Sequence, residues 1–212
     1  MAQQENPTPR RGFFSRAGGL LTVALASAAP AASQAETAAA TQSSWPGKLK
    51  GRHRQMVDAF APNSGYPLAF AYTFLATSPD ATAVVVLRHH AFPLALASPI
   101  WAKYKIGRAL DIIDPETNAP AEKNPYLHPK PGVLVIDQMA IDRLLSKNVI
   151  FGACGIALQV FSAKLASLAG VTPEAAAAEW KANLIPGITL LPSGTWGVNR
   201  AQEHGCTYCS GG

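Results

Sequence analysis

The 212-residue chain lacks a concentrated basic surface, because its 18 lysines and arginines are spread thinly along the sequence. Proteins that bind nucleic acids usually carry a dense basic face with interleaved aromatic residues, so we expect no nucleic acid among the partners. The sequence also lacks a glycine-rich phosphate loop of the Walker or dinucleotide-binding type, and it lacks a Gly-x-Ser-x-Gly motif. It therefore gives no support to a nucleotide-binding enzyme or to a serine hydrolase.

Long, strongly apolar runs are absent as well. The most apolar N-terminal stretch, residues 17–32, is diluted by glycine, threonine, serine and proline. A membrane anchor needs about 20 strongly apolar residues. Proline, glycine or charge interrupts every later apolar run. We therefore expect no stable membrane span in the mature protein.

The N-terminus contains the three parts of an export signal. Arg10 and Arg11 form a charged start, an apolar stretch follows, and a Ser-Gln-Ala sequence ending at Ala35 suits cleavage. Phe13 and Phe14 follow the paired arginines, an arrangement that resembles the twin-arginine type of signal. The sequence therefore predicts export by the twin-arginine machinery and a periplasmic mature protein. An uncleaved tether is the alternative.

One domain is predicted after this signal. Residues 1–35 form the predicted signal, and residues 36–50, rich in Ala, Thr, Ser and Gln, form a predicted disordered lead-in. Residues 51–212 form the domain, which is long enough to bury a hydrophobic core. Within it, prolines punctuate residues 111–132, which predicts a long irregular excursion. Ordered loops of that length are usually functional or contact a partner.

Hydrophobic patterns predict alternating strands and helices. The β-branched run at residues 82–87 and the apolar run at 149–153 are typical of strands buried on both faces. Further strands are predicted at residues 52–60 and 188–191. Helices are predicted at residues 64–75, 99–104, 139–147, 156–169, 172–185 and 193–202. This alternation predicts an α/β domain with a mostly parallel central sheet.

Polar and small residues follow three of the predicted strands. In parallel α/β sheets, ligands bind outside the carboxyl ends of the strands. Three segments should therefore meet at one edge of the sheet: Arg88-His89-His90, Cys154-Gly155 and Pro192-Ser193-Gly194. We expect the arginine, serine and glycines of these segments to contact a bound cofactor or ligand.

Cys154 is the candidate reactive residue. It is predicted at the junction of a buried strand and a helix, where free backbone N–H groups and the helix dipole stabilise a thiolate. That position suits persulfide, redox or metal chemistry. The alternative is a small buried cysteine that packs as an apolar group.

His89 and His90 are candidates for a proton carrier or a metal ligand beside Cys154. Adjacent residues of an extended chain point to opposite sides, so we expect at most one imidazole in the cleft. The alternative for each histidine is a hydrogen bond to the backbone at the end of the strand.

Two of the three cysteines, Cys206 and Cys209, form a C-x-x-C pair near the C-terminus. Three interpretations are open. The pair could form a disulfide that leaves Cys154 free. It could bind a metal ion together with Cys154 or with a histidine such as His204. It could also lie in a frayed terminal segment without a role.

Three segments resemble the DsrE/DsrF-like family of sulfur-handling proteins. They are residues 149–155, in which an apolar strand runs into a lone cysteine, residues 184–194, and residues 200–205 followed by Tyr208. The resemblance covers most of residues 145–208 and, more loosely, residues 52–88. It implies a flavodoxin-like three-layer domain that is often oligomeric. It also implies Cys154 as the carrier of persulfide sulfur.

Three hypotheses of function follow. The first is a periplasmic protein that handles sulfur or thiol redox chemistry through Cys154, assisted by His89 or His90. The second is a non-enzymatic protein that binds a metal ion or a small cofactor through histidines and cysteines near the strand ends and the C-terminal pair. The third is a structural subunit of a homo-oligomer. Whether the protein is an enzyme stays open, as does the bound group, persulfide sulfur or a metal ion.

Overall fold

The computed structural model describes residues 45–212. The predicted export signal and most of the predicted lead-in lie outside the described residues. Trp45 and Leu49, near the end of the predicted lead-in, are buried in one cluster with Met56 and Val84 of the sheet. Burial of these two large side chains removes apolar surface from water and ties the end of the predicted lead-in to the domain.

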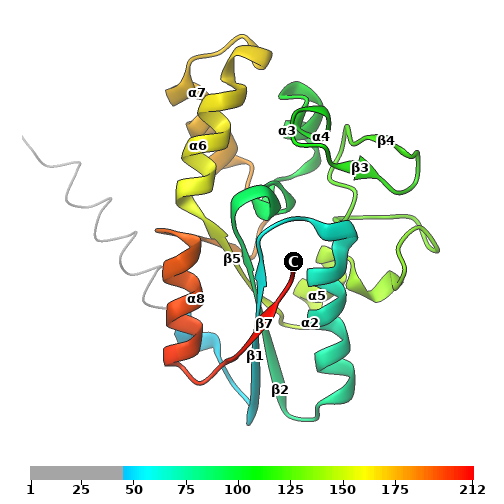
Figure 1. The fold of residues 1–212 in the computed structure, drawn as a ribbon, viewed down its shortest axis with the longest axis vertical. Coiled ribbons are helices and arrows are strands. Elements are labelled where there is room, and N and C mark those ends of the chain that lie inside the picture. The colour runs from blue at the N-terminus through cyan, green and yellow to red at the C-terminus, as the bar shows by residue number, and fades with distance from the viewer. Residues whose placement is uncertain (1–44) are drawn as a thin grey trace, which may run out of the picture.

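Five parallel strands form the central sheet in the order β6-β5-β2-β1-β7 (Figure 1). They are β1 (His53–Ala59), β2 (Ala81–Leu87), β5 (Ile150–Cys154), β6 (Ile188–Leu191) and β7 (Thr207–Ser210). In the central register, Val57 pairs with Val85, and Val85 pairs with Phe151. The predicted α/β domain with a parallel sheet is therefore confirmed.

The helices lie on both faces of the sheet. They are α2 (Tyr66–Thr77), α3 (Ser98–Lys103), α4 (Ile106–Ala109), α5 (Ile141–Ser146), α6 (Gly155–Leu165), α7 (Pro173–Ala182) and α8 (Gly194–Glu203). Short 3-10 helices are η1 (Pro46–Lys48), η2 (Asn63–Gly65), η3 (His89–Ala95), η4 (Asp137–Met139) and η5 (Ala166–Ala169). Helices α2 and α5 lie on one side of the sheet and α8 lies on the other, which gives three layers (Figure 1).

Alternate residues of the strands fill two separate cores. Val57, Val85 and Phe151 pack in the larger core, together with Leu68 of α2. The residues that alternate with them pack in a smaller core with Ala201 of α8. This alternation follows from the two-residue period of side chains in a strand.

Helices α6 and α7 extend beyond the carboxyl ends of the strands (Figure 1). No single helix within residues 45–212 is long and apolar enough to cross a membrane. The bent pair Gly155–Ala169 and Pro173–Ala182 meets the length and composition requirement only when its two parts are taken together, and these parts are bent by 111°.

Local sequence sets the starts of several helices. Thr172 accepts a hydrogen bond from the amide of Ala175 and is the N-cap of α7, at the predicted start of that helix. The helix predicted from residue 64 begins instead at Tyr66. Ser64 has a φ of 50° inside η2 and makes no capping hydrogen bond, and Gly65 precedes α2 instead.

The excursion at residues 111–132 is more regular than predicted. Strands β3 (Ile113–Asp114) and β4 (Ala119–Pro120) form a two-stranded antiparallel sheet. The buried side chain of Asn124 donates hydrogen bonds to the carbonyl oxygens of Leu94 and Leu96. These bonds join the excursion to the segment that follows β2, because a buried amide must find its partners within the protein.

Candidate functional site

A cleft of about 450 Å³ lies at the carboxyl ends of the strands. Its walls include residues from all three predicted segments, namely Arg88, His89, His90, Cys154, Ser193 and Gly194. Phe60, Ile156, Ala157, Val160, Phe161, Lys164 and Thr195 complete the lining. Chain order reverses at β1, because β2, β5 and β6 follow on one side of it and β7 lies on the other. Ligand sites in open α/β sheets lie at the carboxyl ends of the strands, where such reversals occur.

Among the residues predicted to react or to bind a ligand at this edge of the sheet, Gly155 is the one outside the cleft lining. A Cβ at this position would lie 2.6 Å from the carbonyl oxygen of Leu191. Gly155 therefore allows the start of α6 to approach the end of β6. A larger hollow of about 760 Å³ lies at the opposite edge of the sheet, beside Lys48 and Lys147, and none of the predicted site residues lines it.

Cys154 ends β5 and is the N-cap of α6, as its predicted position requires. Its Sγ accepts a hydrogen bond from the amide of Ala157 at 3.3 Å. The residue is 7% exposed, but it lines the cleft. A negative charge on this sulfur would face an amide donor and the positive end of the helix dipole.

Both histidines line the cleft, which corrects the expectation that at most one would do so. The backbone leaves the extended conformation at His89, where φ is 49°, and begins η3. The two imidazoles then lie on the same side, with ring centroids 4.3 Å apart. The His89 ring also stacks on Phe60 at 4.2 Å, and the His90 ring lies 5.4 Å from that of Phe161.

The surroundings of His89 favour its neutral form. Partial desolvation lowers the pKa of this imidazole below its usual value, and the nearby charges of His90 and Arg88 lower it further. A neutral imidazole can accept a proton. His89 is therefore suited to act as a base in the cleft.

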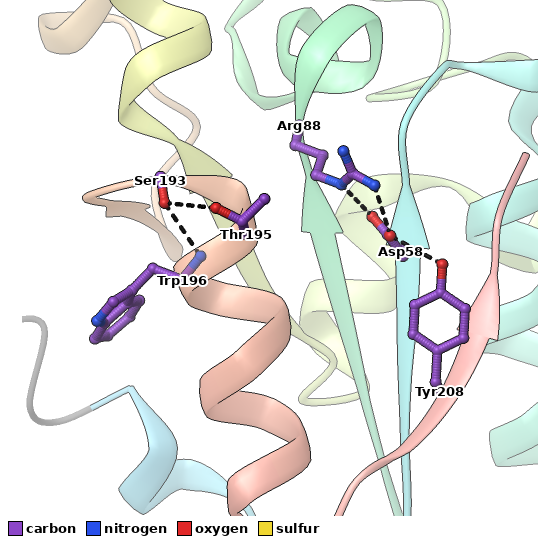
Figure 2. A network of polar contacts seen from close by, with 6 residues as sticks. All are labelled: Asp58, Arg88, Ser193, Thr195, Trp196 and Tyr208. Carbon is purple, nitrogen blue, oxygen red and sulfur yellow. Dashed lines mark hydrogen bonds and ion pairs between the residues drawn. The ribbon is translucent and has the colours of Figure 1, made fainter.

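Arg88 belongs to a network that the sequence analysis did not predict (Figure 2). Its Nε donates to Oδ1 of Asp58 at 2.6 Å, and its Nη2 donates to Oδ2 at 2.8 Å. The hydroxyl of Tyr208 donates to the same Oδ2 at 3.0 Å. The hydrogen bond from Arg88 to Asp58 is the main reason that the pKa of Arg88 is raised. The separate hydrogen bond from Tyr208 to Asp58 likewise raises the pKa of Tyr208.

Arg88 also contacts Phe60 and Gly194 in the cleft. Its guanidinium carbon lies 4.8 Å from the centroid of the Phe60 ring. Its side chain passes so close to Gly194 that a Cβ there would overlap it. The start of α8 thus approaches the cleft because residue 194 has no side chain.

Ser193 caps α8 and does not point a free hydroxyl into the cleft. Its Oγ accepts from the amide of Trp196 at 3.1 Å and lies 3.1 Å from the hydroxyl of Thr195 (Figure 2). The N-termini of α6 and α8 therefore both reach the cleft, with Cys154 and Ser193 as their caps.

The C-terminal cysteines do not come together. All three cysteines lie within residues 45–212 and are free thiols, so the predicted disulfide is not present. Cys206 packs in the smaller core and Cys209 packs against the larger core, on opposite faces of the sheet. The segment is not frayed either, because β7 pairs with β1. This strand was not predicted, since it is short and lacks an apolar run.

The predicted metal site at these cysteines is also not assembled. His204 uses its Nδ1–H to donate to the carbonyl of Arg200 at 2.8 Å. Across residues 45–212, no group of three or more His, Cys, Asp or Glu side chains is arranged to hold a metal ion. Burial raises the pKa of Cys206 to about 11 and raises that of Cys209 as well, so both are protonated thiols at neutral pH.

Sequence reasoning missed Asp58, Phe60 and Phe161 as neighbours of the site. Asp58 is the one acidic residue within the predicted strand at 52–60, and this was the signal that pointed to it. No protein-family model matches the chain, and no curated protein sequence matches it. The resemblance to the DsrE/DsrF-like family therefore stays a prediction, and the function must be argued from the geometry of the cleft.

Proposed function

We propose that this protein handles sulfur or carries out thiol redox chemistry through the Sγ atom of Cys154. The supporting observation is the position of this atom. It caps α6 by accepting a hydrogen bond from the amide of Ala157, and Cys154 lines the same cleft as Arg88. A thiol reacts as its thiolate, and a helix N-terminus stabilises that charge. The resemblance to the DsrE/DsrF-like family suggests the same atom as a carrier of persulfide sulfur.

The elementary step is attack of the Cys154 thiolate on the terminal sulfur of a persulfide donor, R–S–SH. A new S–S bond forms at Cys154, and the S–S bond of the donor breaks. The electron pair of the broken bond leaves with the donor as the thiolate R–S⁻. The terminal sulfur keeps its hydrogen, so Cys154 becomes a persulfide without an added oxidant.

His89 takes the thiol proton before the attack. Its pKa lies below the usual value because partial desolvation and positive neighbours disfavour the imidazolium, so it is a neutral base at neutral pH. The same proton can then pass to the leaving thiolate. His90 lies against His89 and lines the same cleft, so it is the second candidate for this role.

Charge in the cleft favours an anionic donor. Arg88 lines the cleft, and the N-termini of two helices reach it. These groups attract negative charge, both on Cys154 and on an incoming thiolate or persulfide. The proposed substrate class is therefore a small anionic thiol or persulfide, or the exposed persulfide of a partner protein.

The test compares two variants that share the same background. Cys206→Ala/Cys209→Ala keeps Cys154 as its single thiol, and adding Cys154→Ser removes that thiol too. Each protein is incubated with glutathione persulfide, and its intact mass is measured. We expect the double variant to gain one sulfur atom per chain and the triple variant to gain none. Equal labelling of the two proteins would refute the proposal.

Non-covalent binding of a small cofactor is the second candidate, and the apolar rim of the cleft favours it. Ile156 and Val160 are 58% and 55% exposed where α6 borders the cleft. Apolar walls with a few polar groups are typical of small-molecule sites. Native mass spectrometry of protein from its own host separates the candidates. A bound molecule that persists in Cys154→Ser supports binding, and added sulfur that disappears in this variant supports sulfur chemistry.

The proposal also includes a cellular location and an oligomeric state. The paired Arg10 and Arg11 support export by the twin-arginine machinery to the periplasm, with cleavage near Ala35. The family resemblance supports a homo-oligomer. The mass of the exported protein reports the cleavage site, and its native mass reports the number of subunits. Export that is unchanged in Arg10→Lys/Arg11→Lys would contradict the proposed route.

A further inference from the structure

We propose that strand β7 is a redox latch on the cleft, closed while Cys206 and Cys209 are thiols and released when they form a disulfide with each other. The release of the strand can be tested without reference to Cys154. The effect on the cleft rests on the proposed function of Cys154.

The paired strand and the disulfide exclude each other geometrically. Cys206 packs against the α8 side of the sheet, whereas Cys209 packs on the opposite side. Residues 207 and 208 between them are extended and paired with β1. Each residue of a strand advances about 3.3 Å, so the Cα atoms of Cys206 and Cys209, three residues apart, are separated by about 10 Å. A disulfide requires Cα atoms within about 7 Å. The bond can therefore form only after the segment leaves β1.

β7 pairs with one neighbouring strand, and Tyr208 connects it to the ion pair of Asp58 and Arg88. It is four residues long and lies at the edge of the sheet, with β1 as its neighbour. Gly211 donates from its amide to the carbonyl of Asp58 at 2.9 Å, and Thr207 donates from its hydroxyl to the carbonyl of Arg54 at 3.1 Å. Short edge strands open at a low free-energy cost relative to central strands.

Tyr208 connects the latch to Arg88. It stands between the two cysteines in the sequence, and its hydroxyl donates to Oδ2 of Asp58. The same Oδ2 accepts from Arg88, and the Asp58 side chain is only 5% exposed (Figure 2). Withdrawal of Tyr208 would admit water to this carboxylate and weaken its ion pair with Arg88. The positive charge of Arg88 would then be less compensated at the cleft.

The oxidation needs a disulfide as the oxidant, and a small disulfide such as oxidised glutathione supplies it. One cysteine thiolate attacks the glutathione disulfide, forms a mixed disulfide and releases one glutathione thiolate. The second cysteine attacks the protein sulfur of the mixed disulfide, which closes the Cys206–Cys209 bond and releases the second glutathione. Two thiol hydrogens leave the protein as protons, and two electrons reduce the oxidant to two glutathione thiols.

The closed strand protects its own thiols. Burial raises the pKa of both cysteines, to about 11 for Cys206, so the thiolate needed for attack is scarce while β7 is paired. Exchange should therefore proceed through the opened strand. Once closed, the disulfide keeps the strand from pairing again until a thiol reduces it.

The first experiment tests the latch alone, in Cys154→Ser. The protein is equilibrated with oxidised and reduced glutathione at several ratios, and its intact mass and amide hydrogen exchange are measured. We expect the loss of two hydrogen atoms to coincide with loss of protection in residues 206–211. Cys154→Ser/Cys209→Ala is the matched control and should show neither change. A Cys206–Cys209 disulfide with full protection of β7 would overturn the proposal, as would the absence of this disulfide at every ratio.

The second experiment tests the connection to the cleft, in the chain with Cys154 intact. The rate at which anionic iodoacetate alkylates Cys154 is divided by the rate for neutral iodoacetamide. This ratio measures the electrostatic potential at Cys154, because the two reagents differ in charge. We expect oxidation, and separately Tyr208→Phe, to raise this ratio about two- to fivefold. An unchanged ratio after the disulfide has formed would overturn the connection. Failed persulfide loading with a raised ratio would instead count against the proposed function alone.

Discussion

Arg88 and Asp58 form a two-bond ion pair between the end of β2 and the neighbouring strand β1. The Asp58 side chain is 5% exposed and that of Arg88 is 25% exposed, so the pair connects the interior of the sheet to the cleft. Parallel nitrogen–oxygen contacts of this kind hold both side chains in one orientation. The orientation of Arg88 in the cleft is therefore set by a residue that does not line it.

Asp58→Asn should destabilise the protein by about 2 kcal/mol. Removal of one partner from a buried ion pair leaves the other charge uncompensated, and the partial exposure of Arg88 reduces that cost below the value for a fully buried pair. Urea unfolding of the variant and the wild type measures the difference. Tyr208→Phe is the matched control, which loses one hydrogen bond and should cost about 1 kcal/mol. Equal unfolding midpoints for Asp58→Asn and the wild type would show that the pair adds nothing.

His89 should make the protein less stable in mild acid. Its pKa in the folded state lies below the usual value of about 6.5, so the unfolded state binds the proton more readily. The free energy of unfolding should therefore fall as the pH drops below about 6.5, until the folded-state pKa is passed. Urea titrations at several pH values, repeated on His89→Gln, isolate this contribution. The idea fails if the variant loses as much stability on acidification as the wild type does.

Cys206 should resist alkylation while the domain is folded. Burial raises its pKa to about 11, so its thiolate fraction rises about tenfold per pH unit up to that value. Peptide mass analysis after treatment with iodoacetamide at pH 7 and pH 10 measures the change. Unfolding in urea provides the control, because exposure should restore an ordinary cysteine rate. Rapid modification of folded Cys206 at pH 7 would contradict its burial.

Gly194→Ala should disturb the cleft. A Cβ at this position would overlap the side chain of Arg88, so the arginine or the start of α8 must shift. Forced overlap of this kind costs about 1 to 3 kcal/mol. Gly47→Ala is the matched control, since a Cβ there would meet nothing within 4 Å. We expect a lower melting temperature and a changed alkylation rate at Cys154 for Gly194→Ala. Indistinguishable behaviour of the two variants would contradict the close approach.

Local patterns predicted most of the elements that build the sheet. The β-branched run of β2 and the apolar run of β5 indicated buried strands, and the predicted strand at residues 188–191 coincides with β6. The placement of Cys154 at a strand-to-helix junction was also predicted. These features depend on residues that are close in the sequence, since hydrophobic patterns and helix caps extend over one turn or a few residues.

Contacts between distant residues could not be predicted in the same way. Tyr208 reaches Asp58 across 150 positions of the chain, and the short strand that carries it has no apolar signature. Both imidazoles lie in one cleft because the backbone turns at His89, a conformation that the two-residue period of a strand does not anticipate. The local pattern was compatible with a disulfide, a metal site or a frayed segment at Cys206 and Cys209.

The sequence by itself determined the class of fold and the placement of Cys154 at the start of a helix, because periodicity and capping are local properties. The tertiary structure alone decided which groups surround that sulfur and on which faces of the sheet the two other cysteines lie. The physical reason is that strand order and edge pairing depend on the burial of surfaces from distant parts of the chain, and no short stretch of residues specifies them.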